Sequence, residues 1–121
     1  MININVNRGD IFYANLDPVI GSEISKTRPV LIISNDINNK YSNTVTVIPI
    51  SSAKKKNIYP FEVFLKASDI KLKNDSIAKV NQIRTIDKQR LLNKISVLDN
   101  FLISEIEQAI YKHLDLSYAF K

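Results

Sequence analysis

The sequence predicts an α+β protein with a small barrel-like sheet, and two observations carry this prediction. Short segments rich in β-branched and aromatic residues alternate with polar stretches, which is typical of strands and loops. Near the C-terminus, one segment instead repeats its apolar residues at helical spacing. A run of strands followed by one helix indicates an α+β architecture. With 121 residues, 45% of them apolar, the chain suits a single domain spanning residues 1–121.

The first half of the chain predicts three strands. Residues 10–15 contain the sequence Ile-Phe-Tyr-Ala, which favours a strand. Residues 29–34 are apolar on both faces and predict a central buried strand, beginning at a proline that fixes φ and lacks an N–H. Residues 35–43 are rich in Asn and predict a connection with room for one helical turn. Residues 44–50 alternate and are β-branched, which predicts the third strand.

The second half predicts shorter strands and the helix. Residues 51–57 include three successive lysines and predict an exposed loop. We expect strands over residues 61–65, 76–80, 82–85 and 94–98, and a short helical turn over residues 87–91. Asp99 is the expected N-cap of the final helix. The expected packed face of this helix comprises Leu102, Ile103, Ile106, Ala109, Ile110, His113 and Leu114.

Composition narrows the function classes. The chain has no cysteine, which excludes disulfides and thiolate chemistry and suits a cytoplasmic location. No apolar run has the length of a membrane span, and residues 1–7, which lack the pattern of a signal peptide, are expected to form a flexible lead. A single histidine and no clustered carboxylates predict no metal site and no cofactor. Seventeen basic and twelve acidic residues give a charge of +5, which favours a polyanionic partner.

A polar stretch between the first two predicted strands is the main functional candidate. It begins at Gly21, contains Ser22 and Glu23, and ends at Arg28 and Pro29, directly before the apolar strand. Arg28 is therefore expected at a junction between a loop and a rigid strand, where a guanidinium can make a two-pronged contact with a phosphate. An ordinary ion pair between Arg28 and Glu23 on a surface loop is the alternative.

Two separated motifs then resemble the MazF/PemK toxin family. The first runs through Arg8-Gly9-Asp10-Ile11-Phe12-Tyr13-Ala14, Asp17-Pro18-Val19-Ile20-Gly21-Ser22-Glu23 and Arg28-Pro29-Val30-Leu31-Ile32-Ile33-Ser34-Asn35-Asp36. The second is Gln82-Ile83-Arg84-Thr85-Ile86-Asp87-Lys88-Gln89-Arg90-Leu91. The resemblance implies an SH3-like barrel of about six to seven short strands with peripheral helices. It also implies a homodimeric, metal-independent, sequence-specific endoribonuclease that cuts single-stranded mRNA and is neutralised by an antitoxin, expected here to be acidic.

The resemblance implies one pair of acting residues, and the chemistry of nearby polar residues adds further candidates. Arg28 and Ser51 match the arginine and hydroxyl pair that serves RNA cleavage by 2′-OH attack, although Ser52 is adjacent and leaves the hydroxyl assignment open. Glu23 is a candidate proton acceptor or a partner that holds Arg28. Asn15 stands where several relatives carry an acid. The remaining candidates for RNA binding are Ser22, Ser52, Lys54, Gln82 and Arg84.

Two other classes remain open at this point. A non-catalytic basic β-barrel would bind nucleic acid and have no cleavage to lose when Arg28 is replaced. A CcdB-like, gyrase-poisoning toxin has the same fold class but binds a protein. For the dimer, we expect an exposed aromatic first strand and the C-terminal helix to be buried between two copies.

Overall fold

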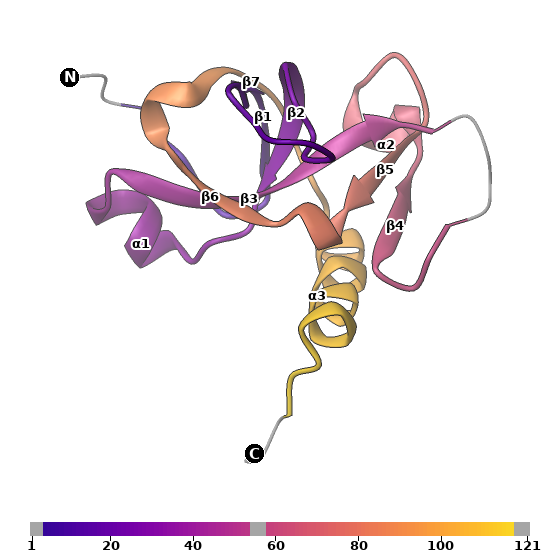
Figure 1. Ribbon diagram of the computed structural model, residues 1–121. Helices are drawn as coiled ribbons and strands as arrows, with labels where there is room; N and C mark the ends of the chain where they lie inside the picture. The colour runs from indigo at the N-terminus through magenta and orange to yellow at the C-terminus, as the bar shows by residue number, and fades with distance from the viewer. Residues whose placement is uncertain (1–3, 54–57, 118–121) are drawn as a thin grey trace.

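The computed structural model describes residues 4–53 and 58–117 and shows an antiparallel sheet with one long helix beside it (Figure 1). The seven strands are β1 (Asp10–Asn15), β2 (Thr27–Ile32), β3 (Thr44–Ser52), β4 (Glu62–Leu65), β5 (Ser76–Lys79), β6 (Arg84–Asp87) and β7 (Leu91–Val97). The helices are α1 (Asp36–Tyr41), α2 (Ala67–Ile70) and α3 (Asn100–Leu114), with 3-10 turns η1 (Val80–Gln82) and η2 (Lys88–Arg90). The predicted α+β class is confirmed.

The strands follow the order β4-β5-β3-β2-β1-β7, and β6 pairs with β3. The long strand β3 is the pivot: its first half pairs with β6 and its second half with β5, while β2 lies on its other side. Strand pairing among the described residues does not close this sheet into a complete barrel. The predicted SH3-like barrel is therefore present as an open, seven-stranded sheet.

Both faces of the sheet are buried because alternate residues of the central strands enter two separate cores. One core includes Ile11, Leu31 and Ile48 and packs against α3 through Ile106. The other core, called here the inner core, comprises Val6, Phe12, Ala14, Leu16, Val30, Ile32, Val45, Val47, Ile86 and Leu91. Residues 4–7 form no helix or strand, although Val6 is buried.

Several predicted boundaries move in the structure. Residues 10–15 form a strand as expected, but β2 begins at Thr27 rather than Pro29, because Arg28 and Pro29 already pair with Ala14 and Tyr13 of β1. β6 lies two residues later than predicted, since Val80–Gln82 first form a 3-10 turn. Helix α2 was not predicted.

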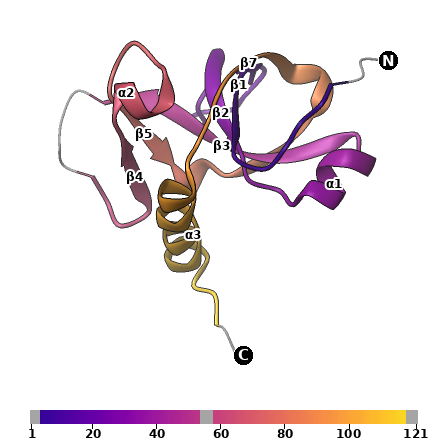
Figure 2. The same ribbon diagram turned by 180° about the vertical axis from the view of Figure 1, so that it is seen from behind.

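The last strand and helix show where simple periodicity fails. β7 begins at Leu91, three residues before the predicted start, and its pairing with β1 contains two irregularities that disrupt the alternation. The 3-10 turn before it confirms the predicted helical turn. Asp99 is the N-cap of α3, accepting a 2.9 Å hydrogen bond from the Leu102 N–H. The predicted packing of His113 and Leu114 is wrong, since this end of α3 extends away from the sheet (Figures 1 and 2).

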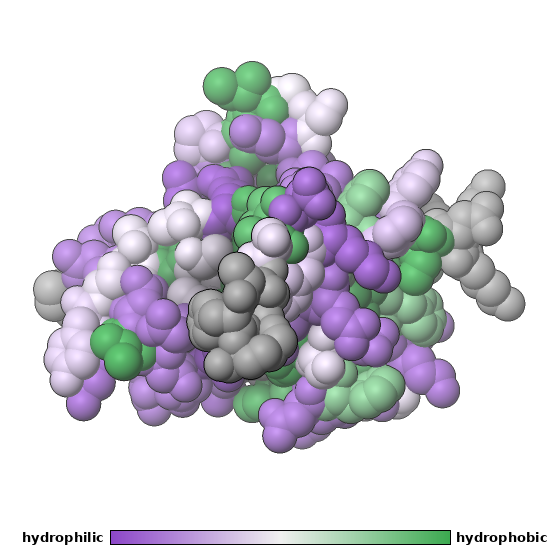
Figure 3. Space-filling model, turned by 90° about the horizontal axis from the view of Figure 1, so that it is seen from below, coloured by the Kyte–Doolittle hydropathy of each residue, from purple (hydrophilic) through white to green (hydrophobic). Residues whose placement is uncertain are grey.

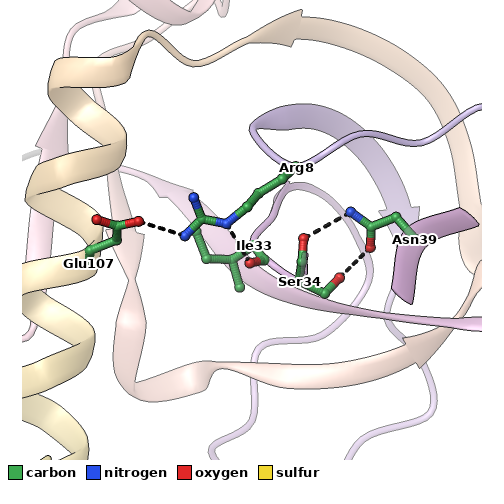
Figure 4. A network of polar contacts seen from close by, with 5 residues as sticks. All are labelled: Arg8, Ile33, Ser34, Asn39 and Glu107. Carbon is green, nitrogen blue, oxygen red and sulfur yellow. Dashed lines mark hydrogen bonds and ion pairs between the residues drawn. The ribbon is translucent and has the colours of Figure 1, made fainter. Parts of the chain in front are cut away.

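A polar corner connects α3 to the sheet (Figure 4). The Arg8 guanidinium forms a 2.9 Å ion pair with Glu107 of α3, and its Nε donates to the Ile33 carbonyl at 3.0 Å. Beside it, the buried Asn39 exchanges two hydrogen bonds with Ser34. Seen from below, the surface is mostly hydrophilic, with separate hydrophobic patches (Figure 3). None of the described helices is long and apolar enough to cross a membrane.

Candidate active site

The β1–β2 loop (residues 16–26) covers one end of the inner core. Leu16 is fully buried in that core and Ile24 packs against it. The base of the loop is closed by a 3.0 Å hydrogen bond from the Leu16 N–H to the Lys26 carbonyl. Gly21 turns the chain at a φ of +57° in open space. This loop carries the polar residues that the sequence singled out, and it leads directly into β2.

Arg28 lies on β2, opposite Ala14 of β1, and is half-buried. Its Nε donates a 3.1 Å hydrogen bond to the Ser25 carbonyl of the loop. Within residues 4–53 and 58–117, its two terminal nitrogens have no hydrogen-bond acceptor, and no ion pair joins Arg28 to Glu23. The guanidinium is thus oriented by one contact through Nε, and both terminal amino groups are left without an acceptor among the described residues.

Ser51 lies on the strand next to Arg28. Val30 of β2 pairs with Pro49 of β3, and continuing this antiparallel register by two residues aligns Arg28 with Ser51. Directly opposed residues point to the same face, so both side chains belong to the face of the inner core. The predicted exposed loop at Ser51 and Ser52 is wrong, because both residues still pair with β5. Ser51 is half-buried and Ser52 is exposed.

Glu23 has a local partner within the loop. Its Oε1 accepts a 2.8 Å hydrogen bond from the Ile20 N–H, and its own N–H donates to the Ile20 carbonyl at 3.2 Å. Together with Ser22, Gln82 and Arg84, it lines an open pocket of about 440 Å³. The structure therefore brings four of the predicted site residues into one pocket.

The side chains of Gln82 and Arg84 both form hydrogen bonds with the backbone of the β1–β2 loop. The Gln82 Oε1 accepts a hydrogen bond from the Ile24 N–H at 3.2 Å, and Arg84 Nη1 donates to the Leu16 carbonyl at 3.4 Å. Arg84 pairs with Val47 of β3, so it shares the face of the inner core with Arg28. The two residues predicted to line an RNA groove are therefore also loop contacts.

Asn15 stands at the entrance of the loop and is exposed, with its Oδ1 accepting a 3.0 Å hydrogen bond from the Asp17 N–H. Sequence reasoning assigned no role to Arg90, although it lies in the second motif. Its Nη1 donates to the Asn15 carbonyl at 3.0 Å and also to the Asp17 carbonyl. Only contacts between distant segments identify Arg90, and sequence spacing does not show them. Lys54 falls outside the described residues.

Metal-ligating groups are scattered in the part of the chain that the structure describes. Residues 4–53 and 58–117 contain no group of three or more His, Asp or Glu side chains placed to hold a metal ion. His113 is exposed near the end of α3, with its ring centroid 6.1 Å from that of Phe61.

An open antiparallel sheet flanked by helices defines a small α+β protein, whose candidate site places an arginine of β2 beside a serine of β3. The chain belongs to the family described as PemK-like, MazF-like toxin of type II toxin-antitoxin system, which it matches over residues 7–114. The resemblance seen in the two sequence motifs is thereby confirmed.

Individual relatives agree with this assignment. The chain is 42% identical over 111 residues to endoribonuclease EndoA of Bacillus subtilis strain 168, covering 92% of this chain and 96% of the relative. It is 44% identical over 105 residues to endoribonuclease MazF of Staphylococcus saprophyticus, covering 87% and 88%. The crystal structure of MazF from Deinococcus radiodurans has the same fold, with a TM-score of 0.81 at 21% identity, covering 94% of this chain and all of that one.

Proposed function

We propose that residues 1–121 form a single endoribonuclease toxin domain that cleaves single-stranded mRNA without a metal ion. Family membership and the endoribonuclease relatives support this activity. The observation that carries the proposal is the placement of Arg28, which is fixed through Nε to the Ser25 carbonyl while its terminal amino groups face no acceptor among the described residues. Such a donor is preorganised for the charge of a phosphorane.

The proposed reaction uses the nucleophile that RNA itself carries. The 2′-oxygen attacks the adjacent phosphorus, and the bond from phosphorus to the 5′-oxygen breaks. The products are a 2′,3′-cyclic phosphate and a 5′-OH end. Arg28 stabilises the negative charge that develops on the non-bridging oxygens, and the Ser51 hydroxyl positions one of them by donating a hydrogen bond. The 2′-OH proton goes to a base, and the leaving 5′-oxygen gains a proton.

Glu23 is the carboxylate that we propose as the proton acceptor. One of its oxygens accepts the Ile20 N–H, which orients the side chain toward the pocket that it shares with Gln82 and Arg84. The proposed RNA contacts outside the reacting phosphate are Asn15, Ser22, Ser52, Lys54, Gln82 and Arg84. Guanidinium and lysine groups contact phosphates, whereas amide side chains recognise unpaired base edges.

We further propose that the protein acts in the cytoplasm as a homodimer and is inhibited by an acidic antitoxin. The family description places its members in toxin–antitoxin systems. A charge of +5 favours an acidic peptide that competes with RNA for the same basic surface.

The test is incubation of the purified protein with a long unstructured RNA in excess EDTA, followed by mapping of the cut sites and chemical analysis of the ends. We expect cleavage at a defined sequence, with cyclic phosphate and 5′-OH ends. Loss of activity on chelation, with recovery on adding magnesium, would contradict the proposed chemistry. RNA that is bound and never cut would indicate a non-catalytic binding protein instead.

A further inference from the structure

Two arginines from one short segment cap the start of the β1–β2 loop. Three successive carbonyls, those of Asn15, Leu16 and Asp17, accept hydrogen bonds from Arg90 and Arg84. Arg90 Nη1 donates to the carbonyls of Asn15 and Asp17, and Arg84 Nη1 donates to the carbonyl of Leu16. Arg90 belongs to η2, which leads directly into β7, so the contact joins the loop to a regular part of the fold.

Asp17 connects the Arg90 contact to the other end of the loop, at Lys26. While its carbonyl accepts from Arg90, its Oδ1 accepts a 2.9 Å hydrogen bond from the Lys26 N–H. Lys26 has a φ of +69°, a left-handed conformation that costs free energy for a residue with a side chain. The contacts around it, including the bond from the Leu16 N–H to the Lys26 carbonyl, hold the residue in this conformation.

These contacts hold together the residues that we call the loop neck: Asn15, Leu16, Asp17 and Lys26. A neighbouring residue connects the loop neck to Arg28. Ser25 precedes Lys26, and its carbonyl accepts from Arg28 Nε. A continuous chain of polar contacts therefore runs from Arg90 through Asp17 and Lys26 to the carbonyl that orients Arg28. Arg90 is the first residue of this chain of contacts and Arg28 is the last.

We propose that Arg90 is a positioning residue for RNA cleavage, acting through the loop neck on Arg28. This inference rests on the proposed function. The Arg90 contacts join exposed backbone at the loop base, where Asn15 and Asp17 are both exposed, rather than groups in either core. Loss of Arg90 should therefore remove the contacts that fix the loop neck and shift Arg28, while the sheet stays folded. A misplacement of about 1 Å in a catalytic group costs roughly 10²-fold in rate.

The experiment measures single-turnover cleavage at saturating RNA and binding of a matched 2′-deoxy RNA. The variants are Arg90→Ala, Arg90→Lys, Asp17→Ala and the Arg90→Ala/Asp17→Ala double variant. Arg8→Ala is the matched control, because Arg8 also donates from its guanidinium to a main-chain carbonyl, that of Ile33, away from the loop (Figure 4). Thermal unfolding of each variant reports its stability.

We expect Arg90→Ala to lower the saturated rate by about 10- to 100-fold with binding of the 2′-deoxy RNA unchanged. Arg90→Lys should recover part of the rate, since one ammonium can still reach a carbonyl. Asp17→Ala should resemble Arg90→Ala, and the double variant should be little slower than either, because both changes release the same loop neck. Arg8→Ala should lower the melting temperature and leave the saturated rate intact.

Three results would overturn the inference. A rate loss in the double variant equal to the product of the two single-variant losses would mean that Arg90 and Asp17 act separately. Weaker binding of the 2′-deoxy RNA with an intact saturated rate would make Arg90 a direct phosphate contact. An equal rate loss in Arg8→Ala would reduce the Arg90 effect to general destabilisation. If Arg90→Ala does not fold, Asp17→Ala and Arg90→Lys still decide between these outcomes. A wild-type protein that cuts no RNA would instead refute the proposed function.

Discussion

Arg28 is the residue on which the proposed chemistry depends. If it stabilises the phosphorane, its contribution grows as charge develops, so Arg28→Ala should lower the rate at saturating RNA far more than it weakens binding. Removing one preorganised donor typically costs about 10²–10³-fold in rate. Single-turnover cleavage, together with binding of a 2′-deoxy analogue, checks this expectation.

Arg28→Lys is the matched variant for this prediction. It retains the positive charge but loses both the planar fork and the Nε bond to the Ser25 carbonyl, so it should recover little of the rate. A variant Arg28→Ala that binds poorly yet cuts at the normal saturated rate would make this arginine a binding contact only.

The two neighbouring serines can be separated by their register. Ser51 aligns with Arg28 when the pairing of β2 and β3 is continued, whereas Ser52 points to the opposite face. Ser51→Ala should therefore slow cleavage by about 10-fold or more, the scale of one lost hydrogen bond to a charged group. Single-turnover rates for both alanine variants make the comparison.

Ser52→Ala is the comparison variant for Ser51, since it removes the same hydroxyl one residue away, at a residue proposed to contact RNA outside the reacting phosphate. Its saturated rate should stay near that of the wild type. Neither change removes a charge, so the salt dependence of RNA binding should hold in both. A larger rate loss in Ser52→Ala than in Ser51→Ala would transfer the proposed role to Ser52.

At this scale, the sequence located the individual candidates better than their partners. The junction of a polar loop with an apolar strand indicated where Arg28 lies. Glu23, the partner that an ordinary surface ion pair would give Arg28, instead accepts a hydrogen bond from the Ile20 N–H. This contact depends on the backbone conformation of the loop, which residue spacing does not predict. The contacts of Gln82 and Arg90 with the loop join segments far apart in the chain, so no local pattern predicts them.

Among the elements, the turn before β4 depends on one buried carboxylate. Burial raises the pKa of Glu62, but a 2.5 Å bond from Lys79 Nζ and a 3.1 Å bond from the Tyr59 N–H outweigh burial and hold the pKa below its ordinary value of 4.5. A lowered folded-state pKa contributes stability at neutral pH that is lost as the pH falls below about 4.5.

Glu62→Gln should therefore destabilise the protein by about 1.5–3 kcal/mol at pH 7, the scale of a hydrogen bond to a charged group. The difference in melting temperature from wild type should shrink as the pH is lowered below 4.5, because the wild type loses the same charge. Thermal unfolding across this range is the measurement. Glu105→Gln is the control, since Glu105 takes part in none of the ion pairs among the described residues; a pH-independent gap for Glu62→Gln would contradict the assignment.

The elements also show what periodicity can and cannot encode. β1 was predicted to the residue because its aromatic and aliphatic run is short and bounded by polar residues. β7 was predicted three residues short, since irregular pairing with β1 removes the alternation that marks a strand. The sequence did not predict α2, because four residues are too few to show a helical period. The last turn of α3 keeps the apolar pattern but extends past the sheet, so pattern alone overstated its packing.

For the whole molecule, we predict a homodimer that keeps one of the two elements expected from the sequence, the C-terminal helix α3, and replaces the other, the first strand β1. The aromatic strand β1 lies between β2 and β7, and Phe12 is only 3% exposed, so this strand cannot form the interface. Large apolar side chains are exposed on the edge strand β7 and on the first turn of α3: Leu92 at 52%, Val97 at 55% and Phe101 at 72%. An edge strand with such residues is a natural pairing surface.

Light scattering at micromolar concentration should report about twice 13.8 kDa for the wild type. Val97→Glu and Phe101→Glu should shift the protein to the monomer, because a charge would be buried in the interface. Ile37→Glu is the control, since Ile37 is 76% exposed on α1, which belongs to neither element of the proposed interface. A dimer that survives both changes on β7 and α3 would place the interface elsewhere.

The pairing of β1 with β7 has a consequence for synthesis. Asp10, near the start of the chain, pairs with Val97, and Arg90 caps the loop that follows β1. A nascent chain that has not yet reached Arg90 has neither contact, because both partners are still missing. The sheet is completed only after β7 has been synthesised, so we expect a chain released from the ribosome before that point to be inactive.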